Sequence, residues 1–155
     1  MESVLLNRPE LITQIDEKLK KRDGIQTVAL TGPGGSGKTT LARQYGHLQK
    51  TNPIWEINAE TRESLNASFE KLAQVLASTE IDQRILRGFQ EIKDPTEKED
   101  RIIQFVKERL KLIENWVLIY DNLETFADIQ KHFPHDSDTW GQGKIILTTR
   151  DANIE

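Results

Sequence analysis

The chain contains no cysteine, and this absence rules out a disulfide framework, a thiol nucleophile and a cysteine-ligated zinc site. No apolar run approaches the roughly 20 residues that a membrane-spanning helix needs. The first ten residues, MESVLLNRPE, do not have the pattern of a secretory signal. We therefore expect a cytoplasmic protein without a membrane partner.

An excess of basic residues is also missing. The 155 residues include 25 acids and 21 Lys or Arg, which gives a net charge of −4, so no direct contact with nucleic acid is expected. Leu, Ile, Val and Phe make up over a quarter of the chain, which is enough for a packed core. At roughly 150 residues per domain, residues 1–155 predict one domain, with 1–24 as a leading segment.

Short apolar runs alternate with helical patterns along the chain. Alternating strands and helices require crossover connections, which predict a mostly parallel sheet covered on both faces, a three-layer α/β/α sandwich. A capping box of Thr96 and Glu99 is expected to open one of the helices. The runs predict strands at 26–31, 54–58, 116–120 and 144–149, and helices from the glycine cluster to Pro53, at 63–78, at 81–89, from Thr96 to Ile113 and at 125–132.

A glycine-rich segment follows the first predicted strand. It fits the pattern G-x-x-x-x-G-K-[ST] and consists of Gly32, Pro33, Gly34, Gly35, Ser36, Gly37, Lys38 and Thr39. A loop of this kind turns its backbone N–H groups toward phosphate oxygens, and the helix after it adds the positive end of its dipole. The lysine reaches the outer phosphates and the threonine hydroxyl is a ligand for Mg²⁺. The segment therefore predicts binding of ATP or ADP with Mg²⁺.

Two charged residues follow later strands at the edge where the loop is expected. Asp121 ends the apolar run WVLIY, where a carboxylate can coordinate the Mg²⁺ of a nucleotide. Arg150 ends the run KIILTT, from which a guanidinium can reach the γ-phosphate. We predict that Lys38, Asp121 and Arg150 carry the chemistry of the site, and that Thr39 and Asp121 hold the metal.

Several classes of phosphate-loop protein are disfavoured by what is missing. There is no [NT]-K-x-D segment to read guanine, no LSGGQ-like segment of a transporter ATPase, and no Asp-Glu pair at Asp121-Asn122. A small-molecule or nucleotide kinase is the alternative that stays open, although no acceptor pocket or lid can be located in the sequence.

Three segments in this order resemble the NB-ARC group of STAND nucleotide-binding proteins: GPGGSGKTTLA, WVLIYDNLE and GKIILTTRD. The stretch IWEINAETRESLNASFEKLAQVL is similar to the bacterial variant that is joined to tetratricopeptide repeats. The resemblance covers residues 4 to 152. It implies a sheet with strand order 5-1-4-3-2 and a switch domain in which bound ATP, slowly hydrolysed, controls assembly or effector activity.

The resemblance also implies roles for individual residues. Arg8, with the backbone of Leu6 and Asn7, is expected to lie against adenine, and Thr40 completes the predicted nucleotide contacts. Where many members carry a second aspartate, this chain has Asn122. An amide cannot accept a proton as a base, so rapid hydrolysis would require Glu124 or Glu60.

Members of this group normally continue into a fifth strand, a helical domain and a winged-helix domain, followed by repeats. We therefore expect this chain to be a fragment whose partners include those domains and further copies of itself. Without the fifth strand, the first strand would lie at an open edge, so we expect self-association or a loosened phosphate loop. His132 and His135 lack the further ligands of a zinc site, and Trp55, Trp116 and Trp140 are interpreted as packing residues.

Overall fold

The computed structural model describes residues 9–19, 24–32, 37–48 and 53–150. The elements alternate between helix and strand, as the sequence predicts. They are α2 (Pro9–Lys18), β1 (Gln26–Thr31), α3 (Lys38–Leu48), β2 (Ile54–Asn58), α4 (Arg62–Leu76), α5 (Glu80–Phe89), α6 (Pro95–Lys111), β3 (Trp116–Leu123), the 3₁₀ helix η1 (Phe126–His132), α7 (Ser137–Trp140) and β4 (Gly143–Thr149).

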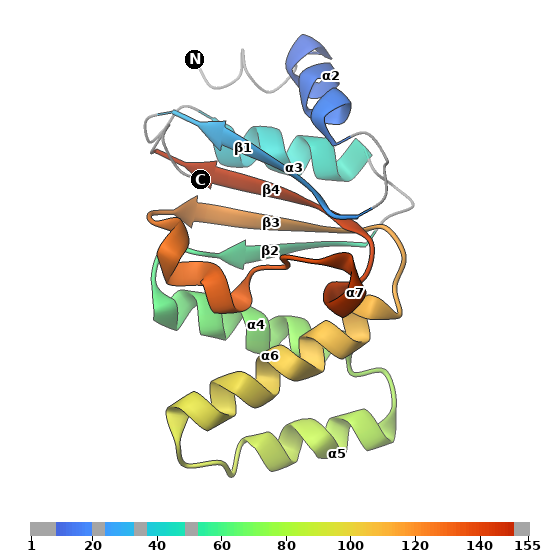
Figure 1. Cartoon of the computed structure of the whole chain (residues 1–155), viewed down its shortest axis with the longest axis vertical. Coiled ribbons are helices and arrows are strands. Elements are labelled where there is room, and N and C mark those ends of the chain that lie inside the picture. Colours follow the sequence, from blue (N-terminus) through green and yellow to red (C-terminus); the bar gives the residue numbers. More distant parts are fainter. Residues whose placement is uncertain (1–8, 20–23, 33–36, 49–52, 151–155) are drawn as a thin grey trace.

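The four strands form one parallel sheet in the order β1-β4-β3-β2. This order agrees with the last four places of the predicted order 5-1-4-3-2. All four arrowheads lie on the same side of the sheet in Figure 1, so the carboxyl ends of the strands share one edge. β1 lies at the end of the described sheet, where Thr27, Ala29 and Thr31 are exposed. Self-association through this strand stays a prediction.

Helices cover both faces of the sheet, which confirms the three-layer α/β/α sandwich. On one face, α2 and α3 enclose an apolar core that includes Leu19, Tyr45 and Ile146. On the other face, α4, α6, η1 and α7 enclose a larger core around Phe69, Val106, Leu118 and Trp140. Helix α5 lies beyond α4 and α6, farthest from the sheet (Figure 1).

The tryptophans pack as expected. Trp116 and Trp140 are fully buried, and the indole Nε1 of Trp116 donates a hydrogen bond to the carbonyl oxygen of Trp140 at 3.0 Å. Trp55 is half-buried and packs against the same core. The hydrogen bond from Trp116 gives its buried indole N–H group, the one polar group of this side chain, a partner.

The predicted capping box of Thr96 and Glu99 is wrong. Helix α6 begins one residue earlier, at Pro95, and its N-cap is Asp94, whose side chain accepts a hydrogen bond from the Thr96 N–H group. Proline suits the first helical position because its missing N–H group would have no partner there. The side chain of Glu99 instead contacts other elements. A capping box is present at the start of α4, between Thr61 and Ser64.

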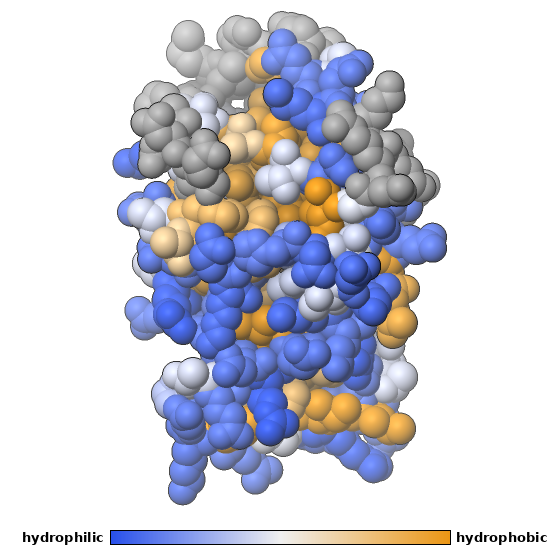
Figure 2. Space-filling model, in the orientation of Figure 1, coloured by the Kyte–Doolittle hydropathy of each residue, from blue (hydrophilic) through white to orange (hydrophobic). Residues whose placement is uncertain are grey.

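The surface is mostly polar on the face shown in Figure 2. Hydrophilic side chains dominate the part that contains α4 and α6, whereas apolar side chains gather above them, over the sheet. A further apolar strip appears at α5, where Ile81 is 69% exposed. Within the described ranges, none of the helices is long and apolar enough to cross a membrane.

Candidate functional site

The ends of three strands bring the predicted residues to one edge of the sheet. β1 leads into Gly32, β3 contains Asp121 near its end, and β4 leads directly into Arg150. The carboxyl edge of a parallel sheet is where ligands of such folds bind, because loops and helix N-termini converge there. Pro33, Gly34, Gly35 and Ser36 lie outside the described residues.

Lys38 and Thr39 form the first turn of α3. Gly37, which precedes them, has φ of 88°, a left-handed conformation that glycine adopts without strain, and its carbonyl oxygen accepts a hydrogen bond from the Leu41 N–H group. The ammonium group of Lys38 turns back toward β1 and donates to the carbonyl oxygen of Gly32. The ammonium group of the lysine therefore lies beside Gly32, at the end of β1.

A short hydrogen-bonded chain connects α3, β3 and β4. The hydroxyl groups of Thr39 and Thr148 each donate to the same oxygen of Asp121, Oδ1, at 2.6 Å. The Thr148 hydroxyl also accepts a hydrogen bond from the Asn122 N–H group at 2.9 Å. Thr39 and Asp121 are 82 positions apart in the sequence, so the tertiary fold brings this pair together.

Cations and a carboxylate share the edge. The pKa of Lys38 is lowered, mainly by burial and then by the positive charge of Arg150, while the Asp121 carboxylate raises it. Arg150, itself exposed, is thus close enough for its charge to act on Lys38. Among the described residues at this edge, the two cations beside the Asp121 carboxylate create a field that favours a polyanion.

The donors present here suit a magnesium ion. Mg²⁺ prefers hard oxygen ligands such as hydroxyl, carboxylate and phosphate oxygens. Thr39 offers a hydroxyl oxygen while its hydrogen points to Asp121, and no described residue donates to the second carboxylate oxygen, Oδ2. These two residues could therefore hold the metal of a bound nucleotide.

A hollow of about 260 Å³ lies beside Asp121, between the edge strand β2 and helix α4. One of its walls carries Arg43, which forms two hydrogen bonds to the carboxylate of Glu56 at 2.8 and 2.9 Å. Further lining comes from Trp55, Ile57, Asn58, Ser68, Lys71, Leu72 and Val75.

The sequence matches the NB-ARC domain family over residues 8–155. The chain belongs to the NB-ARC family. As an NB-ARC domain it is a nucleotide-binding, P-loop domain of the STAND signalling class, as the resemblance of its motifs implied.

Curated relatives of this NB-ARC domain are found in Arabidopsis thaliana. It is 27% identical to the probable disease resistance RPP8-like protein 2 over 99% of this chain and 16% of that protein. It is 26% identical to the disease susceptibility protein LOV1 over 99% of the chain and 16% of that protein, and 29% identical to the putative disease resistance protein At1g59780 with the same coverage.

Two points follow from these relatives. They are plant disease resistance and susceptibility proteins, so they do not support the predicted bacterial subtype with tetratricopeptide repeats. The chain also spans only 14 to 20% of the length of the curated relatives it matches.

The other residues that the sequence predicts for the nucleotide site of this NB-ARC domain lie in different elements. Thr40 is in α3 and exposed, and Glu60 and Glu124 are exposed in the segments after β2 and β3. Asn122 has φ of 62°, a left-handed conformation that asparagine tolerates better than most residues. It lies where the pairing of β3 with β4 is irregular, between Tyr120 and Leu123. Pairing resumes between Leu123 and Thr149, so β3 extends past the predicted strand. Leu6, Asn7 and Arg8 lie outside the described residues.

Sequence reasoning missed Thr148. Its side chain is fully buried and links Asp121 to the backbone of Asn122. The available signal was a pair of hydroxyl residues closing the apolar run KIILTT, at the edge where Asp121 also ends its strand.

Proposed function

We propose that this NB-ARC domain binds ATP·Mg²⁺ or ADP at the carboxyl edge of its sheet and acts as a switch. The observation that carries the proposal is the contact of Thr39 with Asp121, with Lys38 and Arg150 beside it. A hydroxyl, a carboxylate and two cations are the groups that a nucleoside triphosphate and its metal require. The state of the γ-phosphate would then bias the arrangement of the longer protein.

Each residue has a proposed part in this switch. The amides of residues 33–37 surround the phosphates, Lys38 neutralises the outer ones, and Thr39 and Asp121 hold Mg²⁺. Arg150 contacts the γ-phosphate and so distinguishes ATP from ADP. Leu6, Asn7 and Arg8 contact adenine, and Thr40 adds a contact near the phosphates.

Hydrolysis is proposed to be slow. Asn122 cannot act as a base, and Glu60 and Glu124 are exposed side chains that would have to approach the attacking water. A slow reaction suits a switch, because the lifetime of the ATP state then sets the duration of the signal. The metal supplies neutralisation of phosphate charge when bound, while this chain's residues orient and bind the nucleotide.

The partners proposed are further domains of the same longer protein and other copies of it. The names of the relatives, which are disease resistance and susceptibility proteins, support a place in a signalling protein. A cytoplasmic location is proposed because NB-ARC proteins are generally intracellular.

Thermal unfolding with and without nucleotide tests binding. A ligand present at a hundred times its dissociation constant adds about 2.7 kcal/mol to the free energy of unfolding. We expect ATP·Mg²⁺ and ADP to raise the unfolding temperature of the wild-type chain and to leave that of Lys38→Ala unchanged. An unshifted wild-type transition at saturating nucleotide would refute the proposal.

The hollow beside Asp121 keeps the kinase alternative open, because it could hold a phosphoryl acceptor. Analysis of products after incubation with ATP and candidate acceptors separates the two functions. A switch releases inorganic phosphate, whereas a kinase yields a phosphorylated acceptor.

A further inference from the structure

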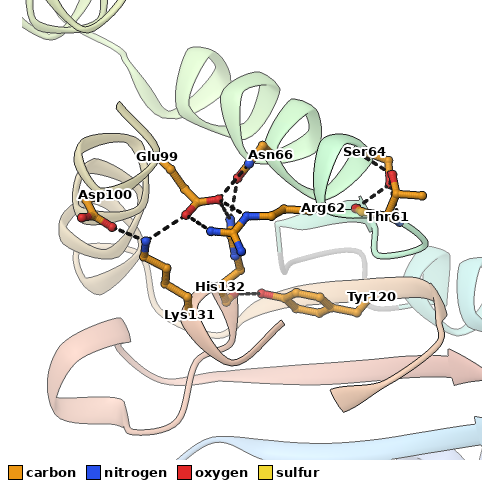
Figure 3. Close-up of polar contacts among 9 residues, drawn as sticks. All are labelled: Thr61, Arg62, Ser64, Asn66, Glu99, Asp100, Tyr120, Lys131 and His132. Atoms are coloured by element: carbon orange, nitrogen blue, oxygen red, sulfur yellow. Dashed lines mark hydrogen bonds and ion pairs between the residues drawn. The ribbon is translucent and has the colours of Figure 1, made fainter. Parts of the chain in front are cut away.

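A buried carboxylate lies away from the predicted nucleotide contacts. Only 4% of the Glu99 side chain is exposed, yet it accepts hydrogen bonds from three residues (Figure 3). Arg62 donates through Nε at 3.1 Å and Nη2 at 2.6 Å, Asn66 through its amide at 2.8 Å, and Lys131 through its ammonium group at 2.8 Å. Burial acts to raise the pKa of Glu99, but the hydrogen bonds from Lys131, Arg62 and Asn66 outweigh it and lower the pKa to about 2. The residue is a fixed negative charge.

The donors belong to elements that start at the candidate site. Arg62 is the first residue of α4, four positions after the end of β2, and Lys131 is in η1, which begins shortly after β3. Glu99 itself is in α6. One carboxylate on α6 therefore fixes the segments that leave two neighbouring strands at the nucleotide edge.

The same segments are connected back to Asp121 and its neighbour. The Ala59 N–H group, in the segment before Arg62, donates to the carbonyl oxygen of Asp121 at 2.8 Å. The hydroxyl of Tyr120 donates to the carbonyl oxygen of His132, next to Lys131, at 2.6 Å. A closed ring of contacts thus runs from Asp121 through Ala59 and α4 to Glu99, and returns through η1 and Tyr120 (Figure 3 shows its α4, α6 and η1 parts).

Asn66 connects Glu99 to His132 by a second set of hydrogen bonds. Because the Asn66 amide nitrogen donates to Glu99, its oxygen accepts from Nε2 of His132 at 2.7 Å. The imidazole is buried, which lowers its pKa to about 4, so it is neutral with its proton on Nε2 at neutral pH. The contact with His132 thus fixes the orientation of the Asn66 amide that donates to Glu99.

Packing of the helices does not need this charge. Leu65 and Phe69 of α4 and Ile102 and Val106 of α6 already form a buried apolar core. Buried ion pairs contribute little net stability compared with apolar residues of similar volume, because desolvation offsets the attraction. A charge with directed donors does, however, select one relative position of the elements that it joins.

We propose that Glu99 is a positioning residue for the metal side of the nucleotide site. It holds the segments 59–62 and 122–132 so that Asp121 faces Thr39 in the geometry that Mg²⁺ requires. This inference rests on the proposed function. It assigns to Glu99 a part in the gain in nucleotide affinity that Mg²⁺ provides. Groups that hydrogen-bond directly to a metal ligand typically change metal affinity by about 10- to 100-fold when they are lost, and Glu99, which acts on Asp121 through Ala59 and Tyr120, is expected to lie at the low end of this range.

The test compares the affinity for ADP with and without Mg²⁺, measured by calorimetry on the whole chain. For Glu99→Gln, which keeps the shape and removes the charge, we expect the gain in affinity from Mg²⁺ to fall about tenfold, with metal-free affinity unchanged. Arg62→Gln and Lys131→Gln each remove one donor to Glu99. Each should lower the ratio of ADP affinity with Mg²⁺ to that without Mg²⁺ by less than Glu99→Gln does. Arg62 is 63% exposed, so its variant decides the matter if Glu99→Gln does not fold.

Glu97→Gln is the matched control, since Glu97 is on the same helix and forms an exposed ion pair with Arg101. It should keep the wild-type ratio. The positioning role is overturned if folded Glu99→Gln or Arg62→Gln keeps that ratio, or if the wild-type chain binds ADP equally with and without Mg²⁺. A wild-type chain that binds no nucleotide would overturn the proposed function as well, which distinguishes the two failures.

Discussion

Acid should destabilise the protein through His132. This imidazole is 1% exposed, and its Nδ1 atom has no hydrogen-bond partner among the described residues. Burial lowers its pKa from 6.5 to about 4. The positive charges of Arg62 and Lys131 act in the same direction, and the negative charge of Glu99, 3.7 Å from Nε2, acts against them. Protonation inside the fold is therefore unfavourable.

The sign and size of the effect follow from the two pKa values. The unfolded chain takes up a proton near pH 6.5 and the folded chain only near pH 4, so the unfolded state binds more protons between them. The free energy of unfolding must then fall as the pH falls through this window. At about 1.4 kcal/mol per unit, the loss reaches about 3 kcal/mol by pH 4. Glu99 adds a further loss between its ordinary pKa of 4.5 and its folded pKa of about 2.

Urea unfolding at a series of pH values from 7 to 4.5 measures this loss. His132→Gln should flatten the dependence, because an amide can still donate to Asn66 but takes up no proton in this range. His135→Gln, at an exposed histidine, should keep the wild-type slope. If His132→Gln loses as much stability on acidification as the wild-type chain, the buried neutral imidazole is not the cause.

Two further predictions concern the free energy of unfolding, one for substitutions of two glycines and one for substitutions of Thr148. A Cβ atom on Gly143 would lie 2.2 Å from Cδ2 of the buried Trp116, so Gly143→Ala should lower the free energy of unfolding by about 3 kcal/mol. Gly88→Ala, in a helix with open space around it, should raise it by about 1 kcal/mol, and equal effects of the two substitutions would contradict the packing described. Thr148→Val removes the hydroxyl that serves Asp121 and should cost about 2 kcal/mol in urea unfolding. Thr148→Ser, which keeps the hydroxyl, should cost less, and the reverse order would show that the methyl group matters more than the hydrogen bonds.

Local signals were sufficient for most of the fold. The strands 26–31 and 54–58 agree with the structure at both ends, because a glycine cluster ends the first and Pro53 precedes the second. The alternation of strands and helices led to the parallel sheet, and the family resemblance to its strand order. The short helix α7 was not predicted, since its four residues contain no repeated apolar spacing.

Contacts across the chain explain what the sequence could not reveal. Thr96 and Glu99 have the spacing of a capping box, but Glu99 is 33 positions from Asn66 and 32 from Lys131, and these partners hold its carboxylate instead. The glycine-rich motif was enough to predict that Lys38 and Thr39 follow β1 at the edge of the sheet. The end of the apolar run WVLIY was enough to predict that Asp121 lies at the same edge. The part of Thr148 depends on the register between β3 and β4, which no local pattern contains.

Calorimetric titration of the chain with ATP·Mg²⁺ tests the central claim most directly. We expect binding by the wild-type protein and none by Lys38→Ala, because the Lys38 ammonium group beside Gly32 is needed to balance phosphate charge. An ATP affinity for Lys38→Ala equal to that of the wild-type chain would show that the nucleotide does not bind at this edge.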